Sequence, residues 1–366
     1  MKTSISKTVP LHIFSILPLI FIIFFIAFML LRFPETASQG ITDGVDLSLG
    51  ILIPSLYPFM ILSTFITETG IFENVPRFID KLAEKVFDLN GSSVYVIILS
   101  LIGGLPMGCK MTSELYEKGK ITLNQGQRLM LFCYCCGPAF TISSVGMYIL
   151  GSKSAGAVLF ASLVLSSLTV GILSRFFDSE SNTQNCKNSE NPKQTLSVSL
   201  VKSVSQGSSA MLNICAWVIL FSCINRLVEI IPIAESARIF SFSVLEVTNA
   251  VYILSGKMSL PIIAGVIGFG GICGHCQVMP YLLKLKLKYK YFITSRIVGG
   301  ALAVIYCEGL MKIIPVSYQV FSIGTRPPDT DFTVSAVFSI SMLFMAGLFL
   351  IGDSTIIKIK TKKHHP

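Results

Sequence analysis

The sequence predicts an all-α polytopic membrane protein of about eight transmembrane helices, with two oppositely oriented re-entrant hairpins in inverted repeats. Its composition, its long apolar runs and the distribution of its basic residues support this fold class. The chain has 366 residues, of which 52% are hydrophobic and 13% charged, and its mean hydropathy is +0.70. A soluble domain carries about 25% charged residues, so this chain has too few to cover a water-exposed surface.

Several apolar stretches reach the roughly 20 residues that a helix needs to cross a bilayer. The first of them is longer than the core of a signal peptide, about 7–15 residues, and no convincing cleavage site follows it, so we expect a retained span. The predicted spans are Leu11–Phe33, Leu49–Thr69, Leu129–Leu150, Ala155–Phe177, Met211–Ile233, Leu260–Leu282, Phe292–Ile314 and Phe332–Ile351.

Lysine and arginine are divided unevenly between the two sides that these spans define. With the N-terminus inside, most Lys and Arg residues fall in cytoplasmic segments, as the positive-inside rule requires. Both termini are therefore predicted to be cytoplasmic. The net charge of +9 then sets topology, and we expect the lipid bilayer as a partner and no nucleic acid.

Two further segments, Ser92–Glu117 and Ile239–Ser255, are apolar but too interrupted to cross the membrane. In the predicted topology the first enters from the inside and the second from the outside. Opposed re-entrant hairpins of this kind form the binding sites of transporters built from inverted repeats. Irregular backbone is tolerated at membrane depth only where protein or a water-filled cavity satisfies its polar groups.

The motif GGLPMGCK (residues 103–110) follows an apolar run and predicts the tip of the first hairpin. Glycine lets the backbone approach a ligand, proline interrupts the helix, and the next half-helix offers its positive dipole end to an anion. A lysine is costly at this depth, which favours a function; the alternative is a cytoplasmic loop with a snorkelling lysine. The candidate substrate-binding residues here are Gly103, Gly104, Pro106, Gly108 and Lys110.

The second hairpin carries Glu246, Thr248 and Asn249 within the apolar sequence VLEVTNA. These side chains need partners, because an unpaired polar group is expensive in hydrocarbon. They are candidates for binding the substrate, and Glu246 also for binding a coupling proton. The alternative is a structural cluster of hydrogen bonds.

The motif FGGICGHCQ (Phe269–Gln277) lies within the sixth predicted span, and its glycines predict a broken helix. Gly271, His275 and Gln277 are candidate substrate-binding residues at this break. Because histidine titrates near neutral pH, His275 is the second candidate for proton coupling. The alternative for His275 is a core histidine satisfied by a carbonyl group.

A third interruption is predicted in YCCGPAF, where Gly137 and a proline fall in the middle of the third span. Cys135, Cys136 and Gly137 are candidate site residues there. The cysteines of this span and the CxxC of Cys273–Cys276 lack the spacing of a metal site, so neither a metal nor a cofactor is expected. No phosphate-binding loop or acyl-transfer motif is present, which argues against an enzyme.

A polar stretch, Asp178–Gln206, divides the chain into two halves with short internal similarities, such as IGGLPMGCK and FGGICGHCQ. Repeats of this kind are common in transporters. The predicted parts are an N-terminal anchor and loop (1–48), a first repeat (49–177), a cytoplasmic linker (178–206), a second repeat (207–315) and a C-terminal helix with a basic tail (316–366).

Two long motifs, GGLPMGCKMTSELYEKGKIT and RLMLFCYCCGPAFTISSVGMYILG, resemble the nucleoside-recognition (Gate) domain. More specifically, they resemble the YlbJ family of sporulation integral membrane proteins. LEVTN and GFGGICGHCQV in the second half are similar to that family too, and the resemblance covers residues 49–314. The arrangement is also similar to concentrative nucleoside transporters, in which substrate lies between two hairpin tips and two broken helices.

The resemblance implies a secondary transporter for a small anionic metabolite during spore formation, with dipicolinate as the candidate substrate. Lys110 would neutralise the anion, and the protein would lie in a cell membrane, with the forespore membrane as the candidate. The alternatives are a nucleoside-type transporter and a non-transporting scaffold for assembly of the spore envelope. Related transporters associate, so a homo-oligomer is a candidate partner.

The chain departs from the family at one place. Where the family has Asn-Asn-Ser before Gly-Pro, this chain has Tyr134-Cys135-Cys136. Two amides that could bind a ligand are replaced by a phenol and a thiol. This departure leaves the identity of the substrate open, with another small anion as the alternative to dipicolinate.

Overall fold

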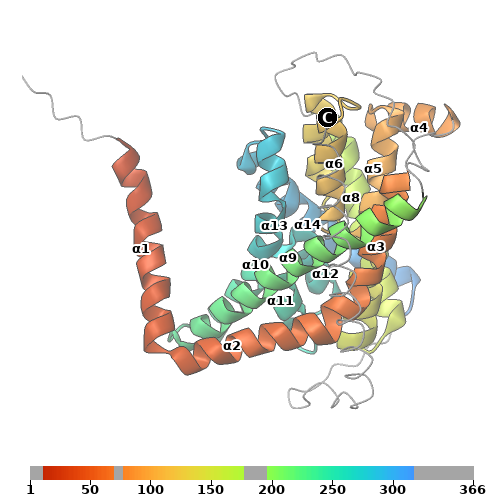
Figure 1. Cartoon of the computed structure of the whole chain (residues 1–366). Coiled ribbons are helices and arrows are strands. Elements are labelled where there is room, and N and C mark those ends of the chain that lie inside the picture. The colour runs from red at the N-terminus through yellow and green to blue at the C-terminus, as the bar shows by residue number, and fades with distance from the viewer. Residues whose placement is uncertain (1–10, 70–76, 177–195, 317–366) are drawn as a thin grey trace, which may run out of the picture.

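The computed structural model describes residues 11–69, 77–176 and 196–316, and every element in these ranges is a helix (Figure 1). The first half contains α1 (Leu11–Arg32), α2 (Pro34–Leu47), η1 (Ser48–Leu52), α3 (Ile53–Thr69), α4 (Arg77–Phe87), α5 (Gly91–Gly103), α6 (Met107–Glu117), α7 (Leu123–Phe132), η3 (Ala139–Ile149), α8 (Lys153–Leu173) and η4 (Ser174–Phe176). The second half contains α9 (Leu196–Ile230), α10 (Glu235–Leu245), α11 (Val247–Leu254), α12 (Leu260–Phe269), α13 (Gly271–Lys284) and α14 (Tyr289–Ile313).

Among the described residues, 4 helical segments are long and apolar enough to cross a membrane, or up to 5 if a pair bent by 57° counts as one span. The predicted helical fold and membrane location are confirmed, whereas eight spans and inverted repeats stay predictions. The predicted span Phe332–Ile351 lies outside the described residues. The four segments are Lys153–Phe176, Leu196–Ile230, Leu260–Lys284 and Tyr289–Ile313.

α5 and α6 form an antiparallel pair, here called the first hairpin. Their outer ends are joined by a hydrogen bond of 3.1 Å from the Asn90 amide to the Lys120 carbonyl, and the turn between them contains Gly104 and Pro106. α10 and α11 form the second hairpin, in which Lys257 Nζ lies 3.7 Å from Glu235 Oε1 at the open end. In Figure 1 the two hairpins lie toward opposite ends of the molecule.

Two longer helical segments are interrupted near their middle. The predicted third span is not one helix, because the backbone leaves helical geometry between Phe132 and Ala139; this interruption between α7 and η3 is called the first break. The second break lies between α12 and α13 at Gly270, whose φ of 85° is left-handed. Glycine adopts that conformation without steric cost, and the broken helix predicted in FGGICGHCQ is present.

α9 and α2 run side by side, α9 also contacts both hairpins, and α1 stands apart from the body (Figure 1). A Cβ at Gly44 would lie 2.7 Å from Ile219 Cα, so the small residues of α2 allow the two backbones to touch. Arg226 binds Asp43 at 2.5 Å across the same contact. α9 begins at Leu196, inside the segment predicted as a linker, and continues through most of the predicted fifth span.

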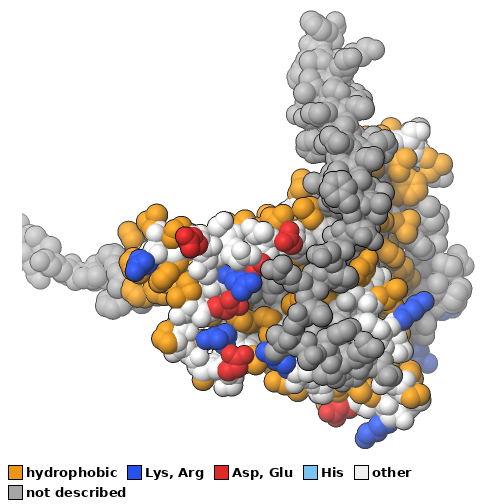
Figure 2. Space-filling view, turned by 90° about the horizontal axis from the view of Figure 1, so that it is seen from below, with side chains coloured by type: hydrophobic (Ala, Val, Ile, Leu, Met, Phe, Trp, Pro, Cys, Tyr) orange, Lys and Arg blue, Asp and Glu red, His pale blue; other side chains and the backbone are white. Residues whose placement is uncertain are grey.

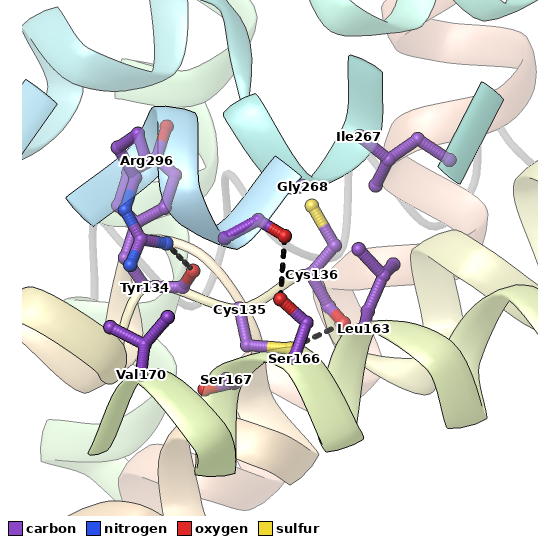
Figure 3. Close-up of a pocket in the computed structure, with 11 residues that line it drawn as sticks. Tyr134, Cys135, Cys136, Leu163, Ser166, Ser167, Val170, Ile267, Gly268 and Arg296 are labelled. Atoms are coloured by element: carbon purple, nitrogen blue, oxygen red, sulfur yellow. Dashed lines mark hydrogen bonds between the residues drawn. The ribbon is translucent and has the colours of Figure 1, made fainter. Parts of the chain in front are cut away.

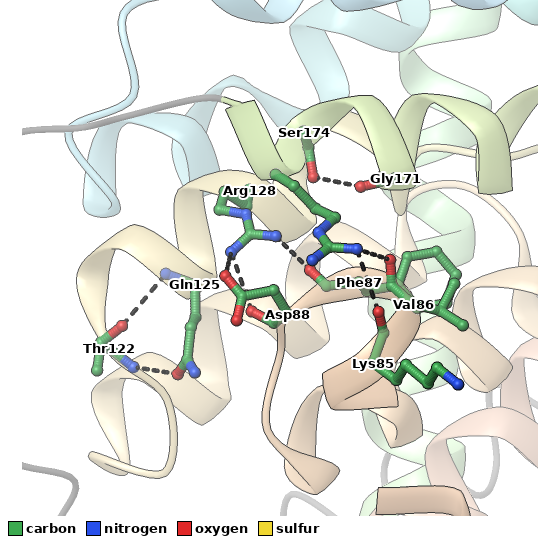
Figure 4. A network of polar contacts seen from close by, with 10 residues as sticks. Lys85, Val86, Phe87, Asp88, Thr122, Gln125, Arg128, Gly171 and Ser174 are labelled. Carbon is green, nitrogen blue, oxygen red and sulfur yellow. Dashed lines mark hydrogen bonds and ion pairs between the residues drawn. The ribbon is translucent and has the colours of Figure 1, made fainter. Parts of the chain in front are cut away.

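Helix α4 is fastened to the body through its C-terminus (Figure 4). Arg128 of α7 donates to the carbonyl groups of Phe87 and Asp88, at 3.0 Å to the second. Arg175 of η4 donates to the carbonyl groups of Lys85 and Val86, at 3.1 and 3.3 Å. The last carbonyls of a helix have no partner within it, and cations also suit its negative dipole end.

The surface agrees with a membrane environment. In the view from below, hydrophobic side chains cover much of the described face, and acidic and basic side chains are scattered among them (Figure 2). Large apolar side chains such as Phe24, Leu31 and Phe176 are 71%, 84% and 86% exposed. Exposure on this scale is costly in water but not against lipid chains.

Candidate functional site

The tip of the first hairpin packs directly on the first break. A Cβ at Gly104 would lie 2.7 Å from the backbone nitrogen of Gly137, and one at Gly137 would lie 3.0 Å from the nitrogen of Gly104. Gly104 also has a left-handed φ of 68°. A side chain at either position would separate these two backbones, which explains the two glycines by packing alone.

The remaining residues of the first motif surround this contact. Gly103 ends α5, and Pro106 precedes the first residue of α6. A Cβ at Gly108 would collide with the carbonyl oxygen of Cys133. The structure therefore brings Gly103, Gly104, Pro106 and Gly108 together with the first break, as a hairpin tip.

The tip of the second hairpin packs on the second break in the same way. A Cβ at Gly271 would lie 3.2 Å from the nitrogen of Val247. Glu246 is 1% exposed and caps α11, because its carboxylate accepts hydrogen bonds from the backbone N–H groups of Thr248 at 2.8 Å and Asn249 at 2.6 Å. A carboxylate is a favourable group at a helix N-terminus.

Tyr134 joins the two breaks. Its hydroxyl donates a hydrogen bond of 3.2 Å to the carbonyl oxygen of Gly270, and its ring covers Gly270 and Gly274, where a Cβ would collide with it. The residue that departs from the family pattern is thus a structural link between α7 and α12. Cys135 and Cys136 are buried beside it, with Gly137.

Arg296 of α14 lies at the same centre and is only 3% exposed. Its guanidinium donates to the carbonyl oxygens of Tyr134 at 2.7 Å and of Leu131, and its carbon lies 5.0 Å from the centre of the Tyr134 ring. Arg296 was not among the predicted site residues. The sequence held a signal for it, because an arginine inside a long apolar helix is costly in free energy and so favours a functional role.

Lys110 lies apart from this centre. Its ammonium donates to Gln206 Oε1 at 2.9 Å and lies 3.8 Å from Glu114. Gln206 donates in turn to Glu68 of α3 at 3.2 Å, and Lys202 lies 3.8 Å from the other oxygen of Glu68. We call these five side chains of α3, α6 and α9 the polar network. Lys110 belongs to this network and not to the meeting point of the breaks.

The polar residues of α13 have partners inside the protein. His275 is buried between the carbonyl oxygen of Phe269 and the hydroxyl of Tyr289, each 3.0 Å from one ring nitrogen. The nitrogen facing Phe269 donates, and the other nitrogen then accepts from Tyr289. Gln277 donates to the sulfur of Cys273 at 3.6 Å. This geometry fits the alternative of a satisfied core histidine.

Asn249 reaches away from the second break. Its amide donates a hydrogen bond of 2.8 Å to the hydroxyl of Ser222 on α9. Thr248 is 2% exposed in the first turn of α11. Within the described part of the chain, no group of three or more His, Cys, Asp or Glu side chains could hold a metal ion.

The helices long and apolar enough to cross a bilayer define an integral membrane protein, with two hairpin tips seated on two helix breaks. The chain is similar to the sporulation integral membrane protein YlbJ of Bacillus subtilis (strain 168), at 22% identity in an alignment 355 positions long that covers 84% of this chain and 87% of the relative. The predicted resemblance to the YlbJ family is therefore confirmed. The likeness to the Gate domain and to nucleoside transporters stays a prediction. No family model matches the chain, and no solved structure matches it significantly.

Proposed function

We propose that this membrane protein is a secondary transporter for a small anionic metabolite in spore formation, with dipicolinate as the candidate substrate. The similarity to a sporulation integral membrane protein supports the link to sporulation. The proposal involves no chemical conversion of the substrate. The proposed transporter has eight spans and inverted repeats. Its hairpins enter the membrane from opposite faces, and both of its termini lie in the cytoplasm.

The observation that carries the proposal is the meeting of two interrupted helices with two hairpin tips at one place inside the molecule. Helix breaks expose backbone N–H and C=O groups, which membrane proteins tolerate only where protein or a cavity satisfies them. In secondary transporters such places bind substrates and ions. A buried arginine at this centre favours an anion over a neutral nucleoside.

Uptake by the purified full-length protein in sealed vesicles tests the proposal. We expect labelled dipicolinate to accumulate under an imposed ion gradient, faster than labelled uridine and faster than in vesicles without protein. A preference for uridine would instead support a nucleoside transporter. Uptake of both solutes at the rate of protein-free vesicles, by protein that still unfolds cooperatively, would favour the non-transporting scaffold and contradict the proposal.

A further inference from the structure

Arg296 is a buried cation whose charge needs an explanation. It lies seven residues after the start of α14, about 10 Å along the helix at 1.5 Å per residue, and 3% of it is exposed. Removing a guanidinium from water costs several kcal/mol unless other groups compensate the charge. The protein groups that interact with the guanidinium therefore show how much of its charge is left for a ligand to balance.

The charge of Arg296 is balanced by carbonyl and hydroxyl groups and by aromatic rings. Two carbonyl oxygens at the end of α7 accept from the guanidinium, the Ser295 hydroxyl lies 3.3 Å from Nε, and the rings of Tyr134 and Phe292 lie 5.0 and 5.7 Å away. Among the described residues, no Asp or Glu side chain forms an ion pair with Arg296. The guanidinium of Arg296 thus has no carboxylate of the described residues paired with it.

The first break adds further donors beside this arginine. Within the described ranges, the backbone N–H groups of Tyr134, Cys135, Cys136 and Gly137 have no backbone carbonyl as acceptor. Successive N–H groups in a non-helical turn form a concave site for anions. A guanidinium and such a turn together present the donors that a carboxylate prefers.

A small cavity lies between these groups (Figure 3). Its volume is about 10 Å³, which is the space of a single water molecule. Arg296, Cys135 and Cys136 line it, with Ser166 and Ser167 on α8. Both serine hydroxyls donate to carbonyl groups, of Gly299 and Phe132. Neither hydroxyl is then available to donate into the cavity, which leaves Arg296 and the backbone of Tyr134, Cys135 and Cys136 among its lining.

We propose that Arg296 and the N–H groups of the first break bind one carboxylate group of the transported anion. This inference rests on the proposed function and deepens it. It assigns the charge recognition to Arg296 on α14 in place of Lys110, whose ammonium is held in the polar network. The cavity accepts one oxygen-sized group, and the rest of the anion requires movement of the hairpin tip seated on Gly137.

Ligand-dependent thermal unfolding of the full-length protein in lipid nanodiscs tests this assignment. The probes are dipicolinate, benzoate, chloride and uridine at equal ionic strength. We expect the two carboxylates, but neither chloride nor uridine, to raise the midpoint temperature, because charge-assisted hydrogen bonds from a guanidinium and backbone N–H groups favour a carboxylate oxygen. Arg296→Gln should abolish this shift.

Arg128→Gln is the matched control. Arg128 is also buried, at 5% exposure, and also donates to carbonyl groups at a helix C-terminus, but it serves α4 and not the breaks. We expect this variant to unfold at a lower temperature and to keep the full shift with carboxylates. If both variants lose the shift, the effect is structural and the assignment is wrong.

The remaining outcomes separate this inference from the proposed function. A carboxylate shift that persists in Arg296→Gln overturns the role of Arg296 but leaves an anion transporter. If neither carboxylate shifts the midpoint of the unsubstituted protein, the role of Arg296 and the proposed anion transport are both contradicted. If chloride shifts the midpoint and Arg296→Gln loses that shift, the ligand of Arg296 is not specifically a carboxylate. If Arg296→Gln does not fold, Arg296→Lys decides: an increase of about tenfold in the half-saturating concentration supports the assignment, because lysine lacks the planar fork. An unchanged concentration overturns it.

Discussion

Glycine residues stand where the backbones of hairpins and breaks come closest. The pair Gly104 and Gly137 leaves no room for a methyl group on either residue, and Gly104 also has a left-handed φ. Gly309 offers a contrast, since nothing lies within 4 Å of a Cβ added there. Glycine in motif GGLPMGCK is therefore required by packing of the tip, before any role in binding.

Gly104→Ala should lower the midpoint of thermal unfolding, because the added methyl group meets the Gly137 nitrogen at 2.7 Å in a conformation that L-residues avoid. We expect a loss of about 1–3 kcal/mol, as in other overpacked sites. Gly309→Ala is the control and should be neutral or stabilising, by up to about 1 kcal/mol. Equal midpoints for the two variants would show that the tip is not tightly packed.

Glu246 combines a proposed function with an observed structural role. Glu246→Ala removes the cap of α11 and should cost about 0.5–2 kcal/mol, whereas Glu246→Gln keeps one acceptor oxygen and should cost less. If Glu246 also carries the coupling proton, Glu246→Gln should remove the effect of a proton gradient on uptake into vesicles. Gradient-driven uptake at the unsubstituted rate would exclude that coupling role.

At the scale of elements, the polar network fastens the first hairpin to its neighbours. Lys110 on α6 reaches Gln206 on α9, and Gln206 reaches Glu68 on α3. The side chains of Lys110 and Glu68 are only 18% and 15% exposed. Partly buried polar groups of this kind stabilise when they are satisfied together and cost free energy when one partner is lost.

A double-mutant cycle on Lys110→Met and Gln206→Leu measures this connection. Each single change should lower the free energy of unfolding by about 1–3 kcal/mol, because it leaves a buried partner unsatisfied. The double variant should lose clearly less than the sum, since the hydrogen bond between Lys110 and Gln206 is counted in both single losses but can be lost only once. Lys284→Ala is the control, because its pair with Glu117 is half exposed and should contribute less than about 1 kcal/mol. Additive losses would argue against the network.

At the scale of the whole molecule, the open ends of the two hairpins are predicted to face opposite sides of the membrane. Lys118 follows α6 at the open end of the first hairpin, and Met258 follows α11 at that of the second. In intact cells, a membrane-impermeant thiol reagent should label Met258→Cys, and it should label Lys118→Cys only after permeabilisation. Labelling of both variants from one side would contradict the opposed hairpins and the inverted repeat.

Local sequence was enough to predict the helical membrane fold and the places where helices are interrupted. Both follow from local chemistry: long apolar runs must be helical in a bilayer, and glycine or proline marks where the helix stops. The motifs at 103–110 and 269–277 were therefore interpreted correctly as a turn between helices and a broken helix. The extent of α9 was not predicted, because its first turns are polar.

Which polar groups meet one another depends on tertiary packing. Arg296 lies 162 residues from Tyr134, and Lys110 lies 96 residues from Gln206. Local sequence shows that each of these residues is unusual in its setting, but not which partner it meets. The partner depends on how hairpins and broken helices pack against one another. For that reason the contact of Arg296 with the first break was not predicted, nor was the contact of Lys110 with Gln206.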